Sequence, residues 1–435
     1  MSIAATPAPP AGHAGVDPVV ADATPHRRTR FGTVIATHSI VDYFSFTIIP
    51  LLTVLEGRLD LSPNQGALLL ALGSICSGVV QPLVAILSDR HDSRLVGVFG
   101  FLAAVLAIGS LGFVQTYPQL LLVQAIGTAG IGAFHPVGAA SAGQLAGSKR
   151  SLGVSIFFVA GMLGGFAGNS ISPFYVDQFG VRALAWLIIP GVLAVGAMAW
   201  AVTRVPHRHR DAHDTHRALP PEVRKLRWRA VWLLFAGNAI RFTVNMALVT
   251  LLVRWAELQA MSRAGVAALD PAVRANASMI NGPLQAAMQV GMAAGGLALG
   301  AMLAPKHQRT GLILVPCIGI AAIALFPFID DVATGPALLA LAWTVAVLTG
   351  IGYGGLVPVT ISLAQRLLPH RTSLASGLMM GGAWSIAAVG PPLAQLAVDH
   401  LGLAAAFGLV ALLLAVSIAL AIALPRGLIR ELSAH

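Results

Sequence analysis

The chain has 435 residues, of which 56% are hydrophobic and only 10% are charged. Soluble domains carry about 25% charged residues, so this chain has too few charges to cover a water-facing surface. Its formal net charge is +10. The basic residues lie in short segments between apolar runs, not in clusters with aromatic residues, which argues against a nucleic-acid partner.

Apolar segments of about 20 residues recur along the whole chain, as is typical of transmembrane helices. They predict an all-α polytopic membrane protein with twelve transmembrane helices. The first six spans are expected at 31–55, 65–88, 94–114, 118–145, 150–176 and 181–203. The other six are expected at 230–253, 280–304, 310–329, 336–366, 372–398 and 402–425.

The order of six spans, a polar segment and six more spans suggests a duplication. Segment 151–180, "SLGVSIFFVAGMLGGFAGNSISPFYVDQFG", aligns without gaps to segment 373–402, "SLASGLMMGGAWSIAAVGPPLAQLAVDHLG". Both begin with Ser-Leu, share a glycine at Gly168 and Gly390, and end in V-D-x-x-G. We therefore expect two pseudo-symmetric six-helix bundles arranged as parallel repeats.

The division into domains follows from these spans. We expect a disordered tail at 1–30, a first bundle at 31–203, a basic linker at 204–229, a second bundle at 230–425 and a tail at 426–435. Residues 1–30 are rich in Ala, Pro and Gly and lack the apolar core of a signal peptide. Of the 27 lysines and arginines, 21 fall on the side of both termini. This bias predicts that both tails and the linker are cytoplasmic.

The linker also holds six potential metal ligands. They have no fixed ligand spacing and lie in a charged, proline-containing segment, so we expect a solvated linker and no metal site. These residues are His207, His209, Asp211, His213, Asp214 and His216.

Two charged residues lie deep inside predicted spans. Asp42 is the one carboxylate that we place there, and Arg241 is the one arginine. Each is 11 residues from the start of the first span of its half, which puts both about 16 Å into a hydrocarbon core of about 30 Å. Charges at this depth are costly and tend to face a partner or a wet cavity. We therefore expect Asp42 and Arg241 at matching sites across the two halves.

The stretch around Asp42 suggests proton coupling. Asp42 would be ionised when it is near Arg241 and protonated when the halves move apart. His38 lies one helical turn before Asp42, and a histidine titrates near neutral pH, so it could relay the proton. Arg241 would attract an anionic or polar substrate group. The alternative is a static buried ion pair with His38 as a hydrogen-bonding neighbour.

Other polar residues within the spans are candidates for lining a substrate cavity. For each of them, hydrogen bonding between helices is the alternative, and His135, which precedes Pro136, could instead mark a helix kink. The candidate substrate-binding residues besides Arg241 are Tyr43, His135, Asn238, Asn245, Gln285, Gln289 and Tyr353.

Three stretches carry a family resemblance. The loop "AILSDRHDSR" ends the second span and holds Asp89, Arg90 and Arg94. The first span has H-x-x-x-D, and the fourth has "GIGAFHPVGAA". The chain thereby resembles the major facilitator superfamily, and within it the fosmidomycin-resistance branch of drug exporters. The resemblance implies a gating role for Asp89, Arg90 and Arg94, although alanine and aspartate replace the two glycines of the superfamily's loop motif.

The resemblance also implies a function. We expect a secondary active transporter of the cell (inner) membrane, a proton-coupled antiporter that exports small drug-like or metabolite molecules by alternating access. No G-x-x-x-x-G-K-[S/T] phosphate loop and no nucleophile set is present, so we expect no enzyme, no catalytic residues and no cofactor. The expected partners are the bilayer, a small substrate and protons, with one chain as the working unit.

Two alternatives remain open at this point. Arg241 favours import of a small organic anion by a proton symporter or a uniporter. A non-transporting receptor or assembly factor built on the same fold is a third hypothesis, and it predicts no substrate flux.

Overall fold

A computed structural model describes residues 24–203, 205, 220–368 and 371–428. These residues form helices joined by short loops, and the described part of the chain contains no strand. The predicted tails fall largely outside the described residues, as does the middle of the linker with its six potential metal ligands.

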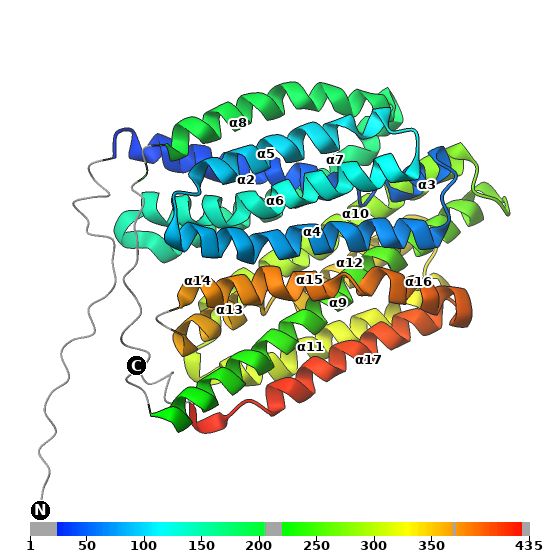
Figure 1. Cartoon of the computed structure of the whole chain (residues 1–435). Helices are drawn as coiled ribbons and strands as arrows, with labels where there is room; N and C mark the ends of the chain where they lie inside the picture. The colour runs from blue at the N-terminus through cyan, green and yellow to red at the C-terminus, as the bar shows by residue number, and fades with distance from the viewer. Residues whose placement is uncertain (1–23, 204, 206–219, 369–370, 429–435) are drawn as a thin grey trace, which may run out of the picture.

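The described residues of the first half form seven α-helices and two longer 3-10 segments (Figure 1). They are α2 (Arg27–Thr47), α3 (Leu52–Arg58), α4 (Pro63–Arg90), α5 (Arg94–Gly109), η1 (Ser110–Phe113), α6 (Tyr117–Leu145), α7 (Arg150–Phe179), η3 (Val181–Leu187) and α8 (Ile188–Val202).

In the second half, the part that the structure describes forms nine α-helices and a short π-helical segment between α14 and α15. They are α9 (Pro221–Ala264), α10 (Pro271–Met302), α11 (Gln308–Leu325), α12 (Gly335–Gly354), α13 (Val357–Leu367), α14 (Thr372–Gly377), η7 (Leu378–Gly382), α15 (Ala383–Ala387), α16 (Gly390–Leu401) and α17 (Leu403–Ile422).

Eleven helical segments of the described chain are long and apolar enough to cross a membrane, or twelve if α2 and α3 form one span bent by 47°. The twelve predicted spans match them in order. Several begin at the capping residues that the sequence provides. Ser62 and Thr116 each form a capping box with the glutamine three residues on, and Asp270 accepts a hydrogen bond from the Val273 backbone N–H. The prediction of an all-α, two-bundle membrane fold is confirmed.

Two predicted spans have wrong boundaries. α10 begins at Pro271, nine residues before the predicted start at 280. α9 is 44 residues long and extends well beyond 230–253 at both ends. Its first turns contain basic residues that we had expected in the linker. Hydropathy detects only the part of a helix that is apolar, so it misses turns that continue into water or into a polar contact. At the far end the helix continues past Arg254 and Glu257, which are buried in an ion-pair network.

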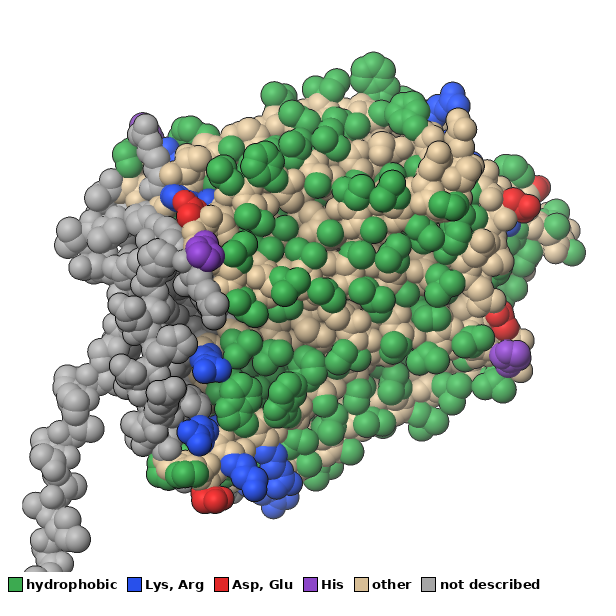
Figure 2. Space-filling view, in the orientation of Figure 1, with side chains coloured by type: hydrophobic (Ala, Val, Ile, Leu, Met, Phe, Trp, Pro, Cys, Tyr) green, Lys and Arg blue, Asp and Glu red, His purple; other side chains and the backbone are tan. Residues whose placement is uncertain are grey.

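The molecule has an apolar belt between two polar ends. Figure 2 shows hydrophobic side chains spread over the middle of the visible face, with charged side chains gathered at the two ends. Leu83, Phe99 and Leu193 are among the large apolar side chains exposed on this body. Such a surface suits lipid and not water. We call the two ends the Arg94 end and the Glu56 end, after a residue at each.

The two halves meet along two seams. At one seam α7 packs on α10, and at the other α4 packs on α15 and α16. Gly282 on α10 allows the first approach, since a Cβ there would lie 2.8 Å from Cγ of Pro173 on α7. Both seams bring together helices from opposite halves of the chain. The site described next lies on helices that these seams hold in place.

Candidate functional site

Three side chains of the first half converge on one point. His38 and Asp42 lie one turn apart on α2, and His135 comes from α6. Nε2 of His38 lies 3.4 Å from Oδ2 of Asp42, and Nε2 of His135 lies 3.3 Å from Oδ1 of the same carboxylate. We call these three residues the His–Asp–His cluster. The structure therefore adds His135, predicted as a substrate ligand, to the pair predicted for proton coupling.

Backbone carbonyls orient both imidazole rings. Nδ1 of His38 lies 2.6 Å from the Phe157 carbonyl oxygen, and Nδ1 of His135 lies 2.8 Å from that of Ile131. A carbonyl only accepts, so each Nδ1 carries the hydrogen and each neutral ring presents a bare Nε2 to Asp42. The His38 ring also stacks on Phe157, with centroids 3.7 Å apart. The cluster is therefore held rigidly from α7 as well.

The cluster leaves no room for a side chain at Gly161 on α7. A Cβ there would lie 2.6 Å from Oδ2 of Asp42 and 2.7 Å from Nε2 of His38. We expect Gly161→Ala to displace the cluster and to reduce transport strongly. Gly196→Ala is the matched control, since its Cβ would meet nothing within 4 Å. Transport in reconstituted vesicles checks this, and equal activity of the two variants would contradict it.

Arg241 lies on α9 in the second half and is 2% exposed. Its Nη1 donates to Oδ1 of Asn238 at 3.2 Å, and its Nε has no hydrogen-bond partner. Asn238 in turn accepts from Thr360 and donates to the Met379 carbonyl. Within the described residues, no carboxylate pairs with Arg241. In this conformation the Asp42 carboxylate lies beside the two histidines and forms no ion pair with Arg241.

The other predicted cavity residues mostly join helices to one another. The Tyr353 hydroxyl on α12 donates to Asn245 on α9 at 2.8 Å, and Nε2 of Gln285 on α10 donates to the Val249 carbonyl at 3.2 Å. Tyr43 accepts a hydrogen bond from Ser172 at 3.4 Å. Gln289 is buried, with no partner for its Oε1. These contacts favour interhelical hydrogen bonding for Asn245, Tyr353 and Gln285, and leave Gln289 free for a ligand.

The loop that resembles the superfamily motif is described only in part. The side chains of Asp89 and Arg90 lie outside the described residues. Arg94 forms an ion pair with Asp92, and its Nη1 donates to the carbonyls of Thr203 at 3.0 Å and Val205 at 2.6 Å. Arg94 therefore ties the start of α5 to the end of α8, within the first half.

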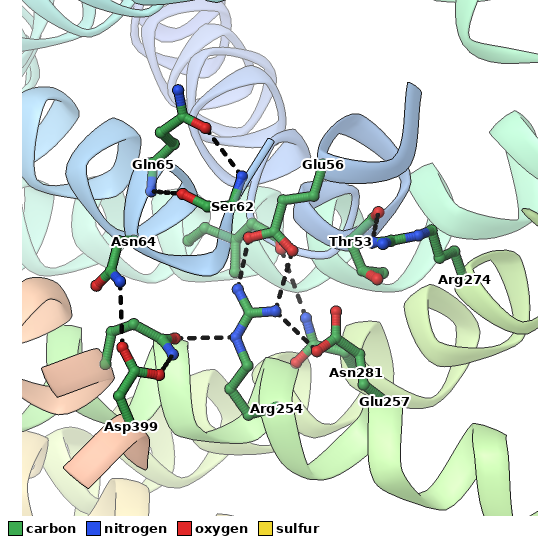
Figure 3. Close-up of polar contacts among 12 residues, drawn as sticks. Thr53, Glu56, Ser62, Asn64, Gln65, Arg254, Glu257, Arg274, Asn281 and Asp399 are labelled. Atoms are coloured by element: carbon green, nitrogen blue, oxygen red, sulfur yellow. Dashed lines mark hydrogen bonds and ion pairs between the residues drawn. The ribbon is translucent and has the colours of Figure 1, made fainter. Parts of the chain in front are cut away.

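At the Glu56 end, a buried ion-pair network joins the halves (Figure 3). Arg254 on α9 contacts Glu56 on α3 through Nη2 at 2.5 Å and Nη1 at 3.0 Å, and Nη1 also contacts Glu257 at 2.7 Å. Nε of Arg254 donates to Gln395 on α16. Glu56, Arg254 and Glu257 are 1%, 7% and 4% exposed. We call these four residues the Glu56 network.

The predicted spans do not reveal the Glu56 network. Glu56 and Arg254 each lie one residue beyond the end of a predicted span, 31–55 and 230–253, and charges at span ends usually face water. The spacing of Arg254 and Glu257, three residues apart in the sequence, allows an ion pair on one helix face, and that was the available signal. Nothing local shows that Glu56, from the other half, completes it.

Further polar contacts between the halves surround the network. Arg274 donates to the Thr53 carbonyl and Asn64 to Asp399 (Figure 3). Ser278 donates to the Pro50 carbonyl. Ser74 on α4 donates to the Trp384 carbonyl nearer the middle of the seam. Toward the Arg94 end, α4 and α14 are also in contact, since a Cβ on Gly377 would lie at an ordinary van der Waals distance of 3.7 Å from Pro82. The polar contacts between described residues of the two halves thus lie at the Glu56 end and along the middle of the seam.

Twelve spans in two bundles, with buried charged groups in each and a polar closure at one end, define a multi-pass membrane transporter. The chain belongs to the Major Facilitator Superfamily, whose family model matches residues 34–346. The predicted family is confirmed.

Relatives and solved structures agree with this assignment. The chain is 22% identical to the fosmidomycin resistance protein of Escherichia coli (strain K12) over 406 residues, 92% of this chain and 93% of that protein. It is 26% identical to the cyanate transport protein CynX of the same strain over 349 residues, 79% of this chain and 83% of that protein. The nucleoside transporter NupG superposes with a TM-score of 0.67 at 12% identity, covering 93% and 99% of the two chains, which shows the shared fold.

Proposed function

We propose that this chain is a proton-coupled antiporter of the cell (inner) membrane that exports small, anionic, drug-like or metabolite molecules. The observation that carries the proposal is the division of buried charge between the halves. The first half holds a carboxylate between two histidines, and the second half holds Arg241 with no acidic partner among the described residues. One half is thus built to hold a cation and the other to hold an anion.

The two groups have separate roles in this proposal. Asp42, with His38 and His135, takes up and releases the coupling proton. Arg241 and Asn238 receive the anionic group of the substrate, and Gln289 supplies a further polar contact. A buried guanidinium without a counter-charge is costly, and an anionic ligand would offset that cost. In another conformation Asp42 could serve the same purpose, which would link proton release to substrate binding.

In alternating access, one end of the transporter is closed while the other is open, and in this proposal the Glu56 network closes the Glu56 end. The bias of basic residues toward the Arg94 end favours a cytoplasmic Arg94 end and an outward-facing Glu56 end. Transport then requires the halves to separate in turn at each end. The transporter proposed here works as a single chain.

Export is supported by the relative named for fosmidomycin resistance, and fosmidomycin is the first probe to use. Cells that overproduce the protein are expected to tolerate more of the compound than cells that lack it. Everted vesicles should take it up when a proton gradient is imposed. If the compound leaves the cells no faster than the background rate and enters the everted vesicles no faster than that rate, export of this probe is refuted.

The second candidate is import of a small anion, which Arg241 and the relative named for cyanate transport favour. Right-side-out vesicles that accumulate cyanate under an inward proton gradient would support import over export. Flux of either probe refutes the third hypothesis, a receptor or assembly factor that does not transport.

Substitution of Arg241 tests its role with either probe. Arg241→Gln is expected to weaken the apparent affinity for the anion by about 10- to 100-fold, since a hydrogen bond to a charged group contributes about 1.5–3 kcal/mol. Arg241→Lys keeps the charge and should recover part of the loss, although it lacks the planar fork of donors. Concentration-dependent uptake measures both variants. Equal affinity of Arg241→Gln and the wild type would contradict an anion-binding role.

A further inference from the structure

We propose that the His–Asp–His cluster is a binding site for a divalent transition-metal ion, with Zn²⁺ as the best match. The inference goes beyond the proposed transport function. It concerns what His38, Asp42 and His135 can bind together, and it rests on the geometry of these three side chains.

Three sets of lone pairs face one another in the cluster. The backbone carbonyls of Phe157 and Ile131 take the Nδ1 hydrogens, so both neutral imidazoles turn a bare Nε2 toward the carboxylate. The Nε2 of His38 is buried and has no hydrogen-bond partner. An acceptor facing an acceptor in a buried place is unfavourable unless a cation lies between them.

The distances match an ion better than direct hydrogen bonds. Charge-assisted N–H···O contacts are usually about 2.7–2.9 Å long, whereas the two Nε2–carboxylate separations here are 3.4 and 3.3 Å. Two ligands on one tetrahedral Zn²⁺, each bound at about 2.0–2.1 Å, lie about 3.3–3.4 Å apart. The three donor atoms of the cluster all lie within 4.8 Å of one another. A small closing movement would bring them around one ion.

A single proton cannot satisfy all three groups. It bridges one imidazole to the carboxylate and leaves the other bare Nε2 facing an acceptor. Two protons would leave two imidazolium rings beside one carboxylate, with a net positive charge in a buried site, and such charges are costly. One divalent ion contacts two nitrogens and the carboxylate at once.

The surroundings are those of a metal site with an open position. A metal-bound histidine usually donates its other N–H to a carbonyl or carboxylate, as both rings do here. The His135 side chain is 22% exposed, so the cluster is reachable from outside. Two histidines and one carboxylate leave a fourth position for water or for a ligand group. The nitrogen and oxygen donors favour Zn²⁺ and related ions over Mg²⁺ or Ca²⁺.

The test measures metal binding by the full-length chain in lipid nanodiscs. After dialysis against buffered Zn²⁺, we expect one ion per chain. With Co²⁺ instead, we expect a visible ligand-field band, and X-ray absorption should show two imidazole nitrogens around the ion. Asp42→Asn and His135→Ala should each lose the ion and the band. The wild-type spectra report the ligands directly, so the assignment of imidazole ligands does not depend on how well a variant folds.

The linker histidines need a control of their own. A chain with His207, His209, His213 and His216 all changed to alanine is expected to keep the bound ion, and so is the surface variant His400→Ala. Loss of the ion from the linker variant, or its retention in both cluster variants, would overturn the proposal, as would a wild-type chain that binds none. A chain that transports but binds no Zn²⁺ would leave the proposed function intact.

Discussion

Replacing Asp42 with asparagine is expected to abolish transport driven by a proton gradient, down to the level of protein-free vesicles. Asparagine keeps the shape of the side chain but cannot gain or lose a proton between the two histidines. Asp42 is the only acid that contacts His38 or His135 in the described part of the chain. No neighbouring carboxylate can therefore take over its role.

The measurement separates coupling from binding. Proteoliposomes are loaded with the substrate, and flux is recorded first with an imposed proton gradient and then as exchange at equal pH. The variant should lose the gradient-driven flux and keep the exchange, which needs no net proton movement. Asp177→Asn is the control, because Asp177 is exposed at the end of α7. Full gradient-driven flux in Asp42→Asn would remove Asp42 from the coupling mechanism.

Replacing Arg254 with alanine is expected to open the Glu56 end. The change leaves Glu56 and Glu257 buried near each other without a positive charge. Breaking a buried ion pair by removing one partner costs about 3–5 kcal/mol, which corresponds to a shift of roughly 100- to 1,000-fold or more between two conformations. The halves can avoid this cost by separating at that end and letting water reach the carboxylates.

Distances between labels on the two halves measure this opening. Spin labels at the exposed positions Gln178 and His400, in a chain without Cys76 and Cys317, should show a longer separation in Arg254→Ala than in its parent. Arg263→Ala is the control, since Arg263 is exposed on the last turn of the same helix.

A double substitution sharpens the interpretation. Glu56→Gln removes one of the two carboxylates that Arg254→Ala leaves unpaired. In the Arg254→Ala background, Glu56→Gln should therefore change the label distance much less than it does in the wild type, and in the opposite direction. Additive effects of the two changes would show that Glu56 and Arg254 are not energetically coupled. An unchanged label distance in Arg254→Ala would contradict a gating role for the network.

Much of the fold could be predicted because lipid restricts the choice of structure. Each apolar run must form a helix that satisfies its own backbone, so hydropathy finds the spans in order. Hydropathy fails where a helix contains polar or charged turns, as α9 does at both ends. At its first end, the turns from Pro221 onward are basic and lie outside the apolar span, but they are still helical. At its far end, Arg254 is charged and nevertheless buried.

The candidate site was only partly predictable. The spacing of His38 and Asp42 places them on one helix face. Their depth in the predicted span means that a charge on either side chain is costly. Whether His135 meets them depends on how α2 and α6 are rotated against each other, which local sequence does not fix. The expected contact of Asp42 with Arg241 also depends on the conformation. The Glu56 network depends on contacts between residues almost 200 positions apart.

The two halves differ in one element that has a mechanical consequence. The first span of the first half is interrupted, since α2 and α3 bend by 47° before Glu56. Its counterpart α9 runs for 44 residues with no proline in its interior. Arg241 and Arg254 lie 13 residues apart on this single rod, or about 20 Å along its axis. If Arg241 captures a ligand as proposed, a tilt of α9 would therefore move Arg254 as well, whereas Glu56 lies beyond the bend between α2 and α3. The single long helix of the second half would then draw Arg254 away from Glu56 and open that end.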